Sequence, residues 1–99
     1  MDSLANQLIG VWHTDPEDFH ALEIYGRVTL SFTKDRHLVY TIHADGKDEI
    51  ILLTYRVEGH FLVTDQPSQL NEERTRFSIT PDGNLILHYE GRESTYIRD

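Results

Sequence analysis

The chain has 99 residues, and 17 acidic against 9 basic side chains give it a formal net charge of −8 with the histidines neutral. A chain of this length buries one modest core, so we expect one domain spanning residues 1–99. The absence of cysteine excludes disulfides, thiolate metal sites, iron–sulfur clusters and cysteine nucleophiles. No basic stripe is present to neutralise phosphates, so we expect neither nucleic acid nor a membrane surface as a partner.

The N-terminal residues contain an early acid and no apolar run, which is not the pattern of a secretory signal. The sequence also has no run of about 18 apolar residues that would span a bilayer. We therefore expect a cytoplasmic protein.

A short helical turn is expected within the first eight residues. Asp2 or Ser3 would cap it. Leu4 and Leu8 share one face at four-residue spacing, and Gly10 would end the turn. After this turn the apolar period becomes two, and turn residues recur at intervals of about 8–12 residues, which is typical of a β meander.

The alternation predicts eight strands and no further helix, while residues 19–25 show no readable pattern. The expected strands span 9–14, 26–32, 37–43, 49–57, 60–64, 75–79, 85–89 and 92–98. Their expected inward residues include Val28, Leu30, Phe32, Leu38, Tyr40, Ile42, Ile51, Leu53, Tyr55, Val57, Phe61, Val63, Thr75, Phe77, Ile79, Leu85, Leu87 and Tyr89.

Eight antiparallel strands with short connections form either a sandwich or a closed up-and-down barrel. Closure removes the exposed strand edges that a small acidic protein would otherwise have to protect, so we expect the barrel. Its interior is just wide enough to be filled by side chains or to hold one small ligand. The predicted fold is therefore all-β, a small eight-stranded antiparallel up-and-down barrel with a short N-terminal helical turn.

Gly10 and Trp12 stand on the first expected strand, directly after the helical turn. Their Gly-x-Trp spacing resembles the signature of the lipocalins and their relatives in the calycin superfamily. The resemblance implies that Trp12 plugs one end of the barrel and that an arginine near the end of the last strand packs across it. Arg98 matches that arginine, with Arg92 as the alternative, and such a cation–π contact is worth about 0.5–2 kcal/mol.

Two departures limit what the resemblance implies about a ligand. Thr64 and Asp65 match the start of a lipocalin-like Thr-Asp-Tyr triplet, but Gln66 follows them. The fatty-acid-binding proteins share an early Gly-x-Trp and end in Arg-x-Tyr, whereas the order here is reversed, from Tyr96 to Arg98. The resemblance therefore implies neither a fatty acid nor any other particular ligand.

Residues 64–76 form a polar stretch with a single leucine, longer than a hairpin requires. Loops of this length are enriched in function. We therefore expect contacts to a ligand at the barrel mouth from Asp65, Gln66, Ser68, Glu73 and Arg74. Glu73 points inward if Thr75 does, because the side-chain period is two. The alternative is a solvated loop whose Asp and Ser side chains satisfy backbone groups.

Tyrosines form a second candidate set on inward faces, namely Tyr40, Tyr55, Tyr89 and Tyr96. Each phenol adds one hydroxyl to an apolar cavity, a mixture typical of a site for a small, partly polar molecule. The alternative is aromatic packing with the hydroxyls reaching solvent at the barrel ends.

Metal and catalytic patterns are weak. The six histidines lie on different expected strands and loops without the spacing of familiar metal sites, so we expect no metal or other cofactor. The nearest nucleophile, base and acid are Ser68, His60 and Asp65. Hydrolase or isomerase activity that uses Asp65 or Glu73 is thus a minor hypothesis.

Two main functions remain open. The barrel binds one small, mainly apolar molecule, with tyrosines lining the cavity. Alternatively, a filled barrel acts through its outside as an interaction or structural module, because Val39, Ile50 and Leu52 give it a second apolar face. Either a monomer or a homodimer fits these hypotheses.

Overall fold

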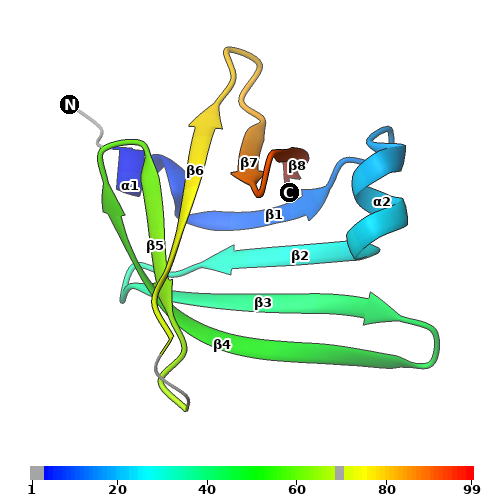
Figure 1. Ribbon diagram of the computed structural model, residues 1–99, viewed down its shortest axis with the longest axis horizontal. Coiled ribbons are helices and arrows are strands. Elements are labelled where there is room, and N and C mark those ends of the chain that lie inside the picture. Colours follow the sequence, from blue (N-terminus) through cyan, green and yellow to red (C-terminus); the bar gives the residue numbers. More distant parts are fainter. Residues whose placement is uncertain (1–3, 69–70) are drawn as a thin grey trace.

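The computed structural model describes residues 4–68 and 71–99. Eight antiparallel strands close into a barrel in sequence order, and β1 pairs with both β2 and β8 (Figure 1). The strands are β1 (Gly10–Thr14), β2 (Arg27–Phe32), β3 (His37–Ala44), β4 (Lys47–Glu58), β5 (Phe61–Asp65), β6 (Glu73–Ile79), β7 (Leu85–Tyr89) and β8 (Arg92–Arg98). The predicted all-β, eight-stranded up-and-down barrel is confirmed.

Two short helices, α1 (Leu4–Leu8) and α2 (Phe19–Tyr25), lie at opposite ends of β1 (Figure 1). We name the two ends of the barrel after them. Leu8 is fully buried and Leu4 packs against the core, as their spacing predicts. The cap expected at Asp2 or Ser3 lies outside the described residues. Neither helix of the described part of the chain is long and apolar enough to span a membrane.

The expectation of no helix after the first turn is wrong, because residues 19–25 form α2. Asp18 caps it by accepting a hydrogen bond from the Ala21 N–H at 3.1 Å. The same carboxylate accepts the Thr95 N–H of β8 at 2.9 Å, which anchors the helix to the barrel. The pattern is hard to read because Ala21 is buried while Phe19 and Ile24 are exposed.

Trp12 closes the α1 end of the barrel. Its side chain is fully buried, and its indole Nε1 donates a hydrogen bond to the Leu8 carbonyl oxygen at 2.9 Å. Arg98 lies opposite Trp12 in the β1–β8 pairing, with its guanidinium carbon 4.1 Å from the indole centroid. Arg98 also donates hydrogen bonds to the carbonyl oxygens of Gln7 and Ile9. One side chain thus joins the last strand to the first strand and to the segment before it.

Gly10 suits both the backbone conformation and the position of Arg98. Its φ of +134° is unfavourable for residues with a side chain, and a Cβ there would lie 2.9 Å from Nη1 of Arg98. Arg92, the alternative partner of Trp12, lies instead at the other end of β8, opposite Tyr89. The structure therefore selects Arg98.

The inward residues of β5 differ from the expectation by one position. Leu62 belongs to the interior core, so Phe61 and Val63 lie on the outer face, and their predicted inward orientation is wrong. Val63 is nevertheless only 1% exposed. Its partners on the neighbouring strands are Arg56 and Arg74, whose long side chains flank it on the outside. Val63 is thus an apolar residue covered by charged side chains, so its hydrophobicity alone does not show which face of the sheet it occupies.

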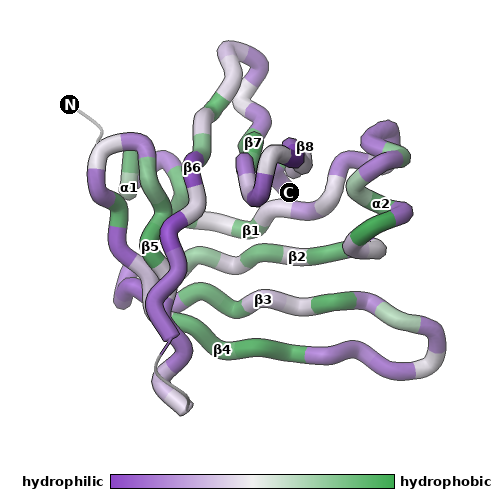
Figure 2. Tube along the Cα trace, viewed as in Figure 1, coloured by the Kyte–Doolittle hydropathy of each residue, from purple (hydrophilic) through white to green (hydrophobic). Residues whose placement is uncertain are grey.

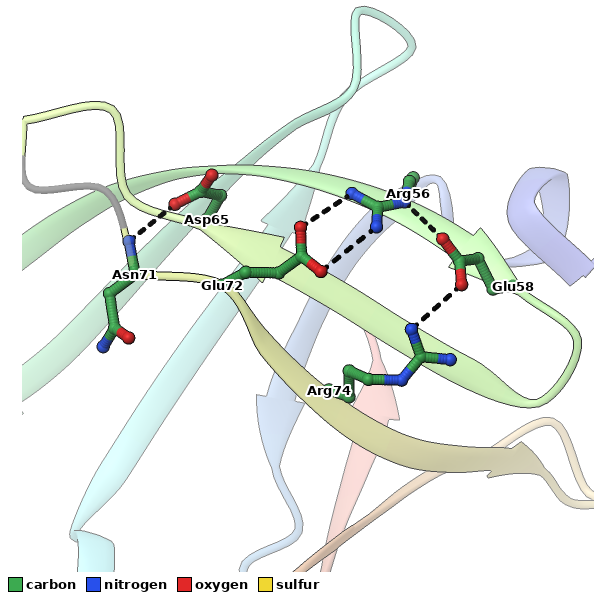
Figure 3. A network of polar contacts seen from close by, with 6 residues as sticks. All are labelled: Arg56, Glu58, Asp65, Asn71, Glu72 and Arg74. Atoms are coloured by element: carbon green, nitrogen blue, oxygen red, sulfur yellow. Dashed lines mark hydrogen bonds and ion pairs between the residues drawn. The ribbon is translucent and has the colours of Figure 1, made fainter.

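A network of ion pairs crosses this outer face (Figure 3). The Arg56 guanidinium donates hydrogen bonds to the carboxylates of Glu58 and Glu72. Arg74 donates to Glu58 at 3.0 Å, and its guanidinium carbon lies 5.2 Å from the Phe61 ring centroid. The hydrogen bond from Arg56 lowers the pKa of Glu58. These four charged side chains are thus paired on the outside of the barrel.

Candidate ligand-binding cavity

A cavity of about 420 Å³ lies inside the barrel and extends towards the α2 end. Side chains from seven of the strands, from α2 and from the β5–β6 loop line it. They are Leu30, Leu38, Ile42, Ile51, Leu53, Leu62 and Leu87, the tyrosines Tyr25, Tyr40, Tyr89 and Tyr96, and the polar residues Thr64, Gln66, Asn71, Glu73, Thr75 and Ser94. Ligand pockets in proteins commonly measure about 300–1,000 Å³ and have mainly apolar walls.

The cavity exists because side-chain size changes along the barrel. At the α1 end the interior is filled by large buried side chains, including Trp12 and Phe32. Further towards the α2 end, β5, β6 and β8 contribute the short side chains of Thr64, Thr75 and Ser94. Because these inward side chains are short, they leave part of the barrel interior unfilled.

Four tyrosines surround this space. Tyr96 is buried and its hydroxyl accepts a hydrogen bond from the Ser94 hydroxyl at 3.2 Å. Burial raises the pKa of Tyr96 to about 12. Burial, and next the neighbouring Tyr25, raise the pKa of Tyr40. Tyr40, Tyr89 and Tyr96 lie in the lining, as the alternation predicts. The raised pKa values of Tyr40 and Tyr96 favour the neutral phenols.

Tyr55 does not line the cavity, although the pattern groups it with the other tyrosines. It is buried at the α1 end, where its hydroxyl donates to the Thr33 carbonyl oxygen at 2.9 Å. Its ring meets Phe32 edge-on, with centroids 5.0 Å apart. Tyr55 thus shows the aromatic packing of the alternative, but its hydroxyl bonds to the backbone instead of reaching solvent.

Side chains of the polar stretch point to both faces of the barrel. Figure 2 shows that the start of β6 is hydrophilic. Gln66 and Glu73 line the cavity, and Glu73 shares the inward face of β6 with Thr75. Arg74, the next residue, points outward into the ion-pair network. Its expected place at the mouth is wrong because successive side chains of a strand alternate between faces.

Two other loop candidates also lie away from the cavity. Asp65 accepts a hydrogen bond from the Asn71 backbone N–H at 2.8 Å, which ties the two sides of the β5–β6 loop together (Figure 3). Ser68 is exposed and is not part of the lining. Asp65 therefore satisfies a backbone group, as the solvated-loop alternative predicts. Residues 69 and 70 of the polar stretch lie outside the described residues.

Sequence reasoning missed several lining residues, among them Tyr25 and Asn71. Tyr25 was hidden because the α2 segment had no readable pattern, yet it follows the buried Ala21 by four residues, one helical turn. Asn71 belongs to the polar stretch, and the Asp65 hydrogen bond to its backbone places it at the cavity. Both residues come from connections at the α2 end.

The expected catalytic trio does not converge. His60 lies in the β4–β5 turn, before β5 begins, whereas Asp65 is the last residue of that strand. A five-residue strand separates them at about 3.3 Å per residue. Ser68 is exposed in the following loop. The structure thus brings no nucleophile, base and acid together from these three positions.

Two histidines take part in a polar chain on the outer face of the barrel. The Thr29 hydroxyl lies 3.1 Å from Nδ1 of His13 and 2.7 Å from Nε2 of His43. Asp99 and Asp48 lie 3.5 and 3.4 Å from the other ring nitrogens of these histidines. Across residues 4–68 and 71–99, no three His, Asp or Glu side chains are grouped as metal ligands.

No known protein family, curated protein sequence or solved structure matches this chain. Kinship with the lipocalins therefore stays an expectation from Gly10, Trp12 and Arg98.

Proposed function

We propose that the protein binds one small, mainly apolar molecule inside the barrel. The observation that supports this proposal is the cavity of about 420 Å³, whose lining includes seven aliphatic side chains and four tyrosines. The aliphatic walls favour transfer of an apolar body out of water. The phenol hydroxyls are suited to orient a polar group of that molecule.

Two neighbouring residues of β4 provide a matched test. Ile51 lines the cavity, whereas Ile50 is 61% exposed on the outer face. In Ile51→Trp the larger side chain fills the cavity, and in Ile50→Trp it enters solvent. We expect small apolar molecules to shift backbone amide resonances of lining residues in the wild type and in Ile50→Trp.

The Ile51→Trp variant is expected to lose these shifts because its cavity is smaller. A fragment library screened by amide resonance shifts measures both variants under the same conditions. Shifts confined to outer-face residues, or equal shifts in Ile51→Trp and the wild type, would contradict binding inside the barrel.

We also propose that the chain is lipocalin-like and cytoplasmic. The Gly10 conformation and the stacking of Arg98 on Trp12 support the first part, because they give the resembling residues a physical role. The absence of cysteine supports the second, since small secreted domains commonly carry disulfides. Fractionation of cells that express the protein tests the location, and recovery outside the cytoplasm would contradict it.

A second candidate function rests on the outer face of β3 and β4. Ile50 and Leu52 are 61% and 64% exposed, and Val39 pairs with Leu52 on the same face. Exposed apolar patches commonly mark contacts between proteins. Self-association through this patch predicts a concentration-dependent mass in sedimentation equilibrium that Leu52→Lys lowers. A monomer at all concentrations would contradict it.

A further inference from the structure

The described residues that line the cavity include a single side chain of a charged type, and it is acidic. Among the described residues of the lining, Glu73 is the only aspartate or glutamate. No lysine, arginine or histidine belongs to this set. The whole chain, Glu73 included, has a formal net charge of −8. Its field therefore attracts cations and repels anions.

Among the described residues, Glu73 differs from its sequence neighbours Glu72 and Arg74 in having no partner of opposite charge. Glu72 is held by Arg56 and Arg74 is held by Glu58, all on the outer face. Within residues 4–68 and 71–99, Glu73 forms no ion pair. Its side chain is exposed at the mouth, so its charge is available to a ligand without the loss of an internal contact.

Aromatic rings and neutral polar groups belong to the same lining as Glu73. Tyr89 lies close enough to Glu73 that the carboxylate charge raises the pKa of Tyr89. Ring faces such as those of Tyr25 and Tyr89 attract cations. Gln66 and Asn71 also line the cavity, and their amide oxygens can accept N–H hydrogen bonds.

We propose that the ligand is an amphiphilic cation, with an apolar body in the aliphatic part of the cavity and a protonated amino group beside Glu73. This inference rests on the proposed function. A ligand with a carboxylate would meet the charge of Glu73 without a compensating cation in the described lining. A protonated amine would instead form a charge-assisted hydrogen bond, which is stronger than a neutral one.

Three probes with the same alkyl chain test the head group alone. Octylamine, octanol and octanoate are titrated into the full chain at neutral pH and low salt, with calorimetry for affinity and amide shifts for location. Octylamine is expected to bind about tenfold more tightly than octanol, and octanoate more weakly than both. Added salt is expected to reduce the octylamine advantage, because the carboxylate is exposed and screened.

Adjacent glutamates provide the matched variants. Glu73→Gln removes the charge and preserves the shape, so octylamine should fall to the affinity of octanol and octanoate should improve. Glu72→Gln removes a charge from the outer face and should leave the order of the three probes unchanged. The wild-type comparison does not depend on the folding of either variant.

The outcomes separate the two proposals. If none of the probes shifts the amides of lining residues, binding inside the barrel and the amine inference both fail. If octanol or octanoate binds there as tightly as octylamine, the cavity proposal stands and the amine inference is overturned. An octylamine advantage that persists in Glu73→Gln overturns the assignment of the amino group to Glu73.

Discussion

Aromatic side chains lie inside the barrel at both the α1 and the α2 end, but the polar atoms of these side chains differ in their hydrogen bonding. At the α1 end, Trp12 donates to the Leu8 carbonyl oxygen and Tyr55 donates to that of Thr33. At the α2 end, Tyr89 is 39% exposed beside a cavity. A polar atom satisfied within the chain completes a plug, whereas one that faces open space can recognise another molecule.

This difference assigns stability mainly to one end and binding mainly to the other. The buried cluster includes Leu8, Trp12 and Phe32, whose side chains fill the α1 end. Substitutions that shorten side chains at the α1 end should strongly destabilise the protein. Substitutions at the α2 mouth should alter ligand binding with little loss of stability.

The largest effect is expected from Trp12→Ala. Removal of a fully buried indole leaves a cavity in the core and should lower the free energy of unfolding by about 3–5 kcal/mol. Urea denaturation followed by circular dichroism measures the loss. Tyr89→Ala at the other end is the control and should cost much less, because this side chain is exposed. Equal losses in the two variants would contradict the division between the ends.

Alkaline pH should destabilise the protein through Tyr96, which lies between the two ends. Its pKa is raised from 10.0 to about 12, mainly by burial. The folded state therefore disfavours ionisation, so the stabilisation is complete below pH 10 and is lost as pH rises towards 12. The loss should reach roughly 2–3 kcal/mol. Urea denaturation across this range should show a shallower decline in Tyr96→Phe, and an identical decline would contradict the role of Tyr96.

Arg98→Ala should have the smallest of these effects on stability. The variant loses the contact with Trp12, worth about 0.5–2 kcal/mol. It also loses the hydrogen bonds to Gln7 and Ile9, which accept from an exposed side chain. Arg92→Ala is the control, since Arg92 lies at the α2 end of the same strand. A larger loss in Arg92→Ala than in Arg98→Ala would contradict the fastening of β8 at the α1 end.

Much of the fold could be predicted because strands with one buried face follow a period of two. Val28, Leu30 and Phe32 alternate with polar residues, and all three are buried. The pattern failed where other contacts covered apolar side chains. Val63 is buried on the outer face beside arginine side chains, and α2 exposes Phe19. The hydrophobicity of a single residue does not indicate whether the core or a surface side chain buries it.

The candidate site was only partly predictable for a related reason. Period two places Glu73 and Tyr40 inside, and both line the cavity. It gives no information on depth, so Tyr55 appeared equivalent to Tyr40 although it belongs to the plug. It also says little about loops, where the Asp65 hydrogen bond to Asn71 determines the geometry. Depth and loop shape arise from contacts between distant residues.

Closure of the barrel limits where another polypeptide can pair with its backbone. Each of the eight strands is paired on both sides over part of its length, including β1 with β8 through Trp12, His13 and Thr14. In β4, however, residues 47–53 pair with β3 alone among the described strands, because β5 pairs only with residues 54–58. This segment carries the exposed Ile50 and Leu52. An extended peptide that adds a strand here would therefore meet backbone donors and acceptors as well as apolar side chains.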